Sequence, residues 1–162
     1  MNTPERLQAL LRELGQRMGL SQLPLDADGG CALELDQRMV VSLQYRETEN
    51  ELWLYADLGP VPRRSPAFYE KLLQANLFWR HTSGATLSLS ADEPPHAVLA
   101  RPLHWMPMDD TSLVAAVESF VNTVEGWQDQ LNQAEAETEA NAGGATNVPL
   151  ADAMGLLLRS RA

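Results

Sequence analysis

The sequence has one cysteine, Cys31, and is poor in positive charge. A single thiol cannot form a disulfide within the chain, and without nearby histidines it cannot build a metal site. Lys and Arg total 12 against 22 Asp and Glu, which gives a net charge of −10 at pH 7. This charge disfavours binding to nucleic-acid phosphates or anionic lipid. The sequence therefore predicts a protein of a reducing compartment whose partners are basic or apolar and include no nucleic acid.

Residues 1–19 lack both a basic leader followed by an apolar run and a membrane-spanning stretch. Five charged residues interrupt them: Glu5, Arg6, Arg12, Glu13 and Arg17. We therefore expect no membrane insertion and a cytoplasmic location. A protein that stays in the cytosol can still assist the export of another.

Motifs for catalysis are also absent: the sequence has no G-x-S-x-G, HExxH, P-loop or GxGxxG. His81, His96 and His104 are not spaced to share one helical face, as metal ligands often do. The adjacent acids at 92–93 and 109–110 are explained by turns and helix capping without acid–base chemistry. We expect no catalytic residue, no metal and no cofactor, and an enzyme that uses a surface histidine is the least favoured alternative.

Apolar residues at helical spacing predict three helices. The first covers residues 4–18, after a start signal at Thr3 and Pro4. The second covers residues 67–78, after Ser65 and Pro66. The third follows the capping candidates at 109–110, and its apolar stripe comprises Leu113, Val117, Phe120, Val124, Trp127 and Leu131.

Alternating apolar residues predict five strands, with three in an antiparallel meander and two in a hairpin, where Pro102 marks an edge or an end. The strands are expected at residues 31–35, 39–45, 52–58, 86–90 and 97–103. The fold class is therefore α+β, with about five antiparallel strands and three helices in the order α-β-β-β-α-β-β-α. Residues 1–132 form the predicted domain.

The third predicted strand is apolar on both faces, since Trp53 and Tyr55 lie opposite Leu52, Leu54 and Leu58. Either a helix covers the aromatic face or a partner does, and the sequence leaves both open. Base stacking by the two rings is disfavoured, because no basic cluster surrounds them.

Residues 133–162 are expected to be a tail. Residues 133–147 contain no large apolar side chain, which favours a mobile or only partly helical segment. Residues 148–162 become apolar again and end in Arg159 and Arg161. A short helix would carry one apolar face formed by Val148, Leu150, Met154, Leu157 and Leu158.

Three sequence patterns resemble the CesT (Tir chaperone) family of class I type III secretion chaperones. The first is Leu72-Leu73-Gln74-Ala75-Asn76 followed by Gly84-Ala85-Thr86-Leu87-Ser88-Leu89, which is similar to the family's LLxAN helix and next strand. The second is Leu10-Leu11-x-x-Leu14-Gly15 with Gly19-Leu20, and the third is the D-x-x-G-x-C-x-L-x-L-D run from Asp26 to Asp36. The resemblance covers about residues 3–132, and the tail departs from it.

The resemblance implies a strongly twisted antiparallel sheet, a homodimer without catalytic residues, and a client bound in extended form through its N-terminal segment. The client would be a secreted effector, kept soluble and competent for secretion in the bacterial cytoplasm, and the secretion ATPase is a further candidate partner. We expect client binding at Leu7, Leu11, Met39, Val41, Trp53 and Tyr55. We expect the dimer interface at Phe68, Leu72, Leu73, Asn76, Phe78 and Trp79.

An alternative within the same fold is a regulatory partner-switching protein, of the anti-activator or sensory-regulator type, that has no secretion client. Both alternatives bind proteins, so the identity of the partner distinguishes them. The sequence does not identify that partner.

Overall fold

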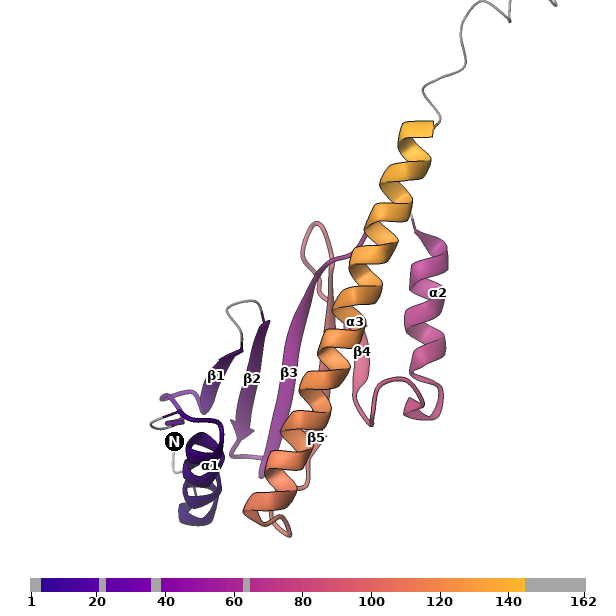
Figure 1. The fold of residues 1–162 in the computed structure, drawn as a ribbon. Helices are drawn as coiled ribbons and strands as arrows, with labels where there is room; N and C mark the ends of the chain where they lie inside the picture. Colours follow the sequence, from indigo (N-terminus) through magenta and orange to yellow (C-terminus); the bar gives the residue numbers. More distant parts are fainter. Residues whose placement is uncertain (1–3, 21–22, 36–38, 63–64, 145–162) are drawn as a thin grey trace, which may run out of the picture.

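We analysed a computed structural model, which describes residues 4–20, 23–35, 39–62 and 65–144. Figure 1 shows three helices and a twisted sheet. The helices are α1 (Glu5–Arg17), α2 (Pro66–Ala75) and α3 (Asp110–Gly144), and a short 3-10 helix, η1 (Leu77–Trp79), follows α2. The strands are β1 (Gly30–Leu35), β2 (Met39–Arg46), β3 (Glu51–Pro60), β4 (Thr86–Leu89) and β5 (His96–Leu103).

The sheet has the strand order β1-β2-β3-β5-β4, and every neighbouring pair is antiparallel. This confirms the predicted α+β fold, the element order, the meander and the hairpin. Pro102 lies in β5, which is not an edge strand of the sheet. The β4 partner pairs with β5 only as far as Ala100, so Pro102 lies where β5 has lost its neighbour on that side. A residue without an N–H is tolerated at such a position.

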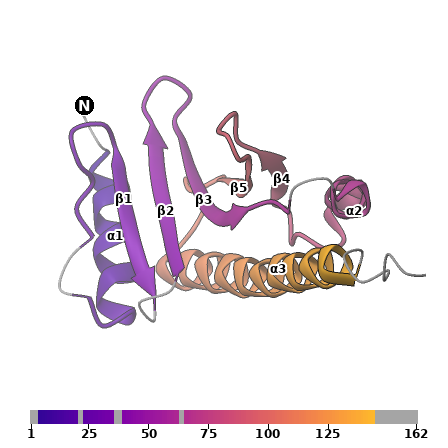
Figure 2. The same cartoon turned by 90° about the horizontal axis from the view of Figure 1, so that it is seen from above.

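Helices α1 and α3 lie on one face of the sheet, and α2 lies beside its β4 edge (Figure 2). Alternate residues of each strand point into this helical layer. In β2 and β3 the buried set comprises Met39, Val41, Leu43, Tyr45, Leu52, Leu54, Ala56 and Leu58. They meet the apolar stripes of α1 and α3 in one core, and burying a leucine or phenylalanine side chain there contributes about 1.5–3 kcal/mol relative to leaving it in water.

The start of α3 agrees with its predicted cap. Asp109 Oδ1 accepts a hydrogen bond of 2.8 Å from the Ser112 N–H, which would otherwise lack a partner in the first turn. The start of α2 differs, because Ser65 makes no capping hydrogen bond with its side chain, although Pro66 occupies the first turn as expected. The cap proposed at Thr3 lies outside the described residues.

Two helix ends differ from the sequence prediction. Helix α2 ends at Ala75 and does not continue to residue 78, because Phe78 has a φ of 54° that no right-handed helix accepts. Helix α3 continues past its last large buried residue, Leu131, to Gly144. Residues 133–140 are mostly Ala, Glu and Gln, which are strong helix formers. The helix therefore continues through them beyond the part that packs on the core. The segment 133–144 is thus helical, whereas the predicted apolar tail at 148–162 lies outside the described residues.

Candidate binding surfaces

No helix within the described ranges lies on the second face of the sheet (Figure 2). Trp53 is half-buried there, and Tyr55 keeps 40% of its surface exposed. The two aromatic residues therefore stand on the uncovered face, with Leu54 between them facing the core. Of the two alternatives that the sequence left open, a covering helix is absent from the described chain.

Three of the four residues that pair with Trp53 and Tyr55 across the strands have short side chains: Ser42, Ala100 and Pro102. Tyr55 pairs across the strands with Ser42 and Ala100, and Trp53 pairs with Gln44 and Pro102. Small cross-strand neighbours leave the faces of large rings accessible, since these neighbours reach less far from the sheet. The Trp53 indole N–H is already bound to Glu51 at 2.9 Å, so the accessible part of the ring is apolar.

The other four residues expected to bind a client lie in the core of the chain. Leu7 and Val41 have no exposed surface, and Leu11 and Met39 keep 2% and 6%. They form no surface patch in this structure, because α1 and α3 lie over the face of the sheet to which these residues point. A charged substitution at Leu11, one of the residues expected to bind a client, would therefore act on folding.

A second apolar surface lies at the end of α2 and in η1, and we call it the α2 patch. It consists of Leu73, Leu77, Phe78 and Trp79, with exposed fractions of 73%, 60%, 74% and 53%. Phe78 and Trp79 both have positive φ, 54° and 51°, a conformation that costs non-glycine residues about 1–3 kcal/mol each. The Arg80 guanidinium carbon lies 5.9 Å from the centre of the Phe78 ring. The backbone thus holds two aromatic side chains in water at a cost in strain.

Asn76 fixes this patch to the edge of the sheet. Its side-chain amide donates a hydrogen bond of 3.0 Å to the Leu87 carbonyl and accepts one of 2.9 Å from the Leu87 N–H. The two bonds satisfy both backbone groups of an edge-strand residue. Phe68 and Leu72, which the sequence analysis grouped with the dimer interface, are buried against the chain's own core. Leu73, Phe78 and Trp79 are the members of that set that reach the surface.

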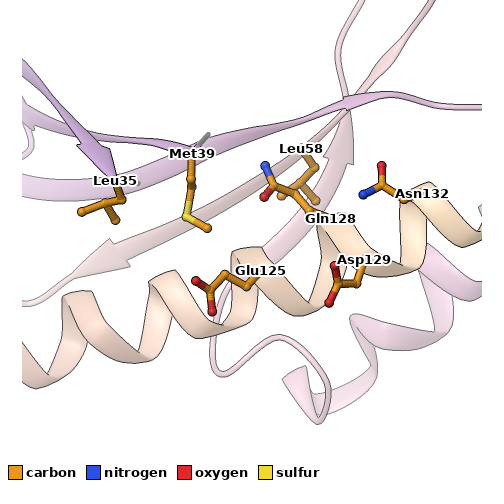
Figure 3. Close-up of a pocket in the computed structure, with 7 residues that line it drawn as sticks. All are labelled: Leu35, Met39, Leu58, Glu125, Gln128, Asp129 and Asn132. Carbon is orange, nitrogen blue, oxygen red and sulfur yellow. The ribbon is translucent and has the colours of Figure 1, made fainter. Parts of the chain in front are cut away.

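A groove along α3 was not found from the sequence. At one end is a cleft of about 410 Å³, lined by Leu35, Met39, Leu58, Glu125, Gln128, Asp129 and Asn132 (Figure 3). At the other is a cleft of about 390 Å³, lined by Leu14, Arg17, Met18, Leu35, Val114, Val117, Glu118, Val121 and Asn122. Both clefts share Leu35, and we call them together the α3 groove. One signal was present in the sequence: Glu118, Glu125 and Asp129 lie seven and four positions apart, which places them on one side of α3.

No three His, Cys, Asp or Glu side chains among the described residues gather to hold a metal ion, and none of the described helices is long and apolar enough to cross a membrane. Burial raises the pKa of the Cys31 thiol to about 11, and the nearby charge of Asp26 adds to this shift. A thiol with this pKa is a poor nucleophile at neutral pH, as expected for a cysteine that packs as a small apolar residue.

Comparison with solved structures shows the same fold in several complexes. In the ExsC–ExsE complex the similar chain is 22% identical, with a TM-score of 0.68, and the match covers 81% of this chain and 97% of that one. The Yersinia pestis type III secretion chaperone SycH, in complex with a fragment of YscM2, is 24% identical with a TM-score of 0.59 over 74% and 97% of the two chains. The ExoU–SpcU complex from the type III secretion system of Pseudomonas aeruginosa contains a chain that is 21% identical, with a TM-score of 0.56 over 74% and 91%.

A search of curated protein sequences gave no match. The model of one protein family does match, over residues 9–128, which is most of the chain. The match spans the core from α1 to α3 and includes the patterns at 26–36 and 72–89 that carried the resemblance. The chain therefore belongs to the Tir chaperone protein (CesT) family, a family of chaperones and not of enzymes.

Proposed function

We propose that this chain is a cytoplasmic type III secretion chaperone that binds the N-terminal segment of a secreted effector in extended form. The family supports this function, and similar chains occur in a chaperone–effector complex and in a complex of a type III secretion chaperone with a fragment of another protein. The observation that carries the proposal for this chain is the aromatic pair Trp53 and Tyr55 on a sheet face that no described helix covers.

An extended client gains most from such a surface. An extended segment presents alternate side chains to one side at a spacing similar to that of the strands below it. Its apolar residues can pack on the Trp53 and Tyr55 rings and over the short side chains of Ser42, Ala100 and Pro102. Aromatic residues that become fully buried on binding contribute most of the affinity at protein interfaces. We assign the client site to this face, centred on Trp53 and Tyr55.

The test is affinity capture from a lysate of the source bacterium with the native chain and with Trp53→Glu. The native chain should capture a protein whose protease-protected part lies within its own N-terminal segment, and Trp53→Glu should lose it. Thr48→Glu, which adds the same charge in the exposed β2–β3 turn, serves as the control and should keep the client. Capture of a folded domain, or equal capture by both variants, would contradict the proposal.

We further propose that the chain is a homodimer formed through the α2 patch. A soluble monomer rarely places four large apolar side chains within seven residues on its surface. The free energy gained when a partner surface buries them would offset the cost of the positive φ at Phe78 and Trp79. A twofold contact would bring each patch against its copy. Light scattering should then give about twice the chain mass of 17.9 kDa.

The same measurement on variants locates the interface. Phe78→Glu combined with Trp79→Glu should give the single-chain mass, because two charges would be buried unpaired in the contact. Val40→Glu is the control, since Val40 is 51% exposed on β2, far from α2 in the strand order. This variant should keep the mass of the dimer. A monomeric native chain, or a dimer that persists in the double variant, would contradict this assignment.

A further inference from the structure

We propose that the C-terminal segment of this chain, residues 148–161, docks in the α3 groove of its own chain. The segment would cover the groove until another molecule displaces it. It goes beyond the binding function proposed above, because it concerns a different surface from the Trp53 and Tyr55 face and an occupant encoded in the same chain.

The groove combines an apolar wall with acidic side chains. In the cleft of about 410 Å³, which is the part of the groove nearer the end of α3, Leu35, Met39 and Leu58 supply the apolar surface. Figure 3 shows Glu125 and Asp129 on α3, below Leu35, Met39 and Leu58 of the sheet in this view. Within the described part of the chain no ion pair involves either of these two acids. The groove therefore suits an apolar segment that carries positive charge.

Residues 148–161 have this composition. Their apolar residues recur at the spacing of one helical face, and the segment closes with Arg159 and Arg161 against a single acid, Asp152. Its net charge is positive in a chain whose total is −10. An amphipathic segment of this kind lays its apolar side into a groove while its charges meet those on the rim.

The length of the chain after α3 fits the distance that it must span. Glu125 lies 19 residues before Gly144, which is about 28 Å along the helix axis. Residues 145–148 in extended form cover about 13 Å, and a helical path from residue 148 to residue 159 adds about 16 Å. A tail that turns back along α3 thus brings Arg159 to the level of Glu125, with Leu150 and Met154 over the cleft of Leu35, Met39 and Leu58.

Tethering makes even a weak contact effective. A segment linked by a few residues has a local concentration near about 1 mM, so a contact of similar dissociation constant is substantially populated within one chain. A competitor from solution must overcome this local concentration before it occupies the same groove. The chain's own tail is therefore favoured to occupy the groove over any free segment of equal affinity.

Disulfide cross-linking in the full chain tests the contact. In a Cys31→Ala background, Glu125→Cys with Arg159→Cys should form a disulfide within one chain under oxidised glutathione. The matched control is Gly126→Cys with Arg159→Cys. Gly126 is one residue further along α3 and about 100° around it, and a Cβ added there meets no atom within 4 Å. Circular dichroism checks that both variants fold.

Isotope-labelled and unlabelled chains refolded together distinguish the source of the tail. The proposal is supported if each disulfide joins two unlabelled (light) peptides or two labelled (heavy) peptides. The disulfide should also form more with Glu125→Cys than with Gly126→Cys. Mixed light and heavy pairs would assign the groove to the tail of a second copy and overturn it. Equal cross-linking at both positions, or none at either, would overturn it as well.

A second measurement avoids new cysteines. Trypsin cleaves after Arg159, and mass spectrometry follows the loss of the last three residues. Glu125→Gln with Asp129→Asn should raise the cleavage rate about fivefold, because two exposed charge contacts are lost. Glu135→Gln with Glu137→Gln removes two acids from α3 beyond the groove and should leave the rate unchanged. Equal rates in the two double variants would contradict docking in the groove.

Discussion

The two faces of the sheet use alternate residues of the same strands in opposite ways. On β3, Leu52, Leu54 and Ala56 are buried under the helical layer, whereas Trp53 and Tyr55 stand on the uncovered face. Both faces carry large apolar side chains, so hydrophobicity alone does not separate folding from binding. The position of α1 and α3 makes the difference. An apolar residue stabilises the chain where a helix covers it, and where none does it is available to another molecule.

The largest effect should come from cutting a side chain on the covered face. Leu54→Ala removes a fully buried side chain and should lower the free energy of unfolding by about 2–5 kcal/mol. Its neighbour on the uncovered face provides the control, since Tyr55→Ala should cost about 1 kcal/mol or less. Urea unfolding measures both. Similar losses in the two variants would remove the distinction between the faces.

The edge of the sheet should show an intermediate effect. Asn76→Ala leaves the N–H and carbonyl of Leu87 without their partners and should cost about 1–3 kcal/mol in the same measurement. Gln74→Ala, an exposed substitution two residues earlier, in α2, should change stability little. If Asn76→Ala is neutral, α2 and η1 are held to β4 by other contacts.

The smallest effect concerns the cap of the covering helix and depends on pH. Hydrogen bonds from Ser112 to the carboxylate lower the pKa of Asp109 below its ordinary value of 3.8. A lowered pKa means that the charged carboxylate stabilises the folded chain above the unfolded pKa, and that this contribution is lost as pH falls through the folded value. Asp109→Ala should therefore be less stable than the native chain near about pH 6, with a difference that shrinks below pH 3.8. A difference that is constant across this range would mean that the charge of Asp109 does not contribute.

Cys31 marks the boundary between what can be inferred from a pattern and what requires contacts. Its place at the start of a strand, on the apolar face, indicated packing and not reactivity. The raised pKa agrees with that inference, but the cause is burial together with the charge of Asp26, five residues earlier in the preceding loop. The pattern predicted the role correctly without supplying the mechanism.

The sequence by itself predicted the elements, their order and the pairing of strands that follow one another along the chain, because caps, turns and alternation act between residues close along the chain. It did not predict that β3 pairs with β5. It also predicted the exposed aromatic residues Trp53, Tyr55, Phe78 and Trp79 as members of binding surfaces, although it did not distinguish them from buried neighbours such as Leu11 and Phe68. Only the tertiary structure decided which face α1 and α3 cover, that Asn76 binds the backbone of Leu87, and that a groove forms along α3. These features depend on contacts between segments far apart in the sequence, and a local pattern carries no information about which segments meet.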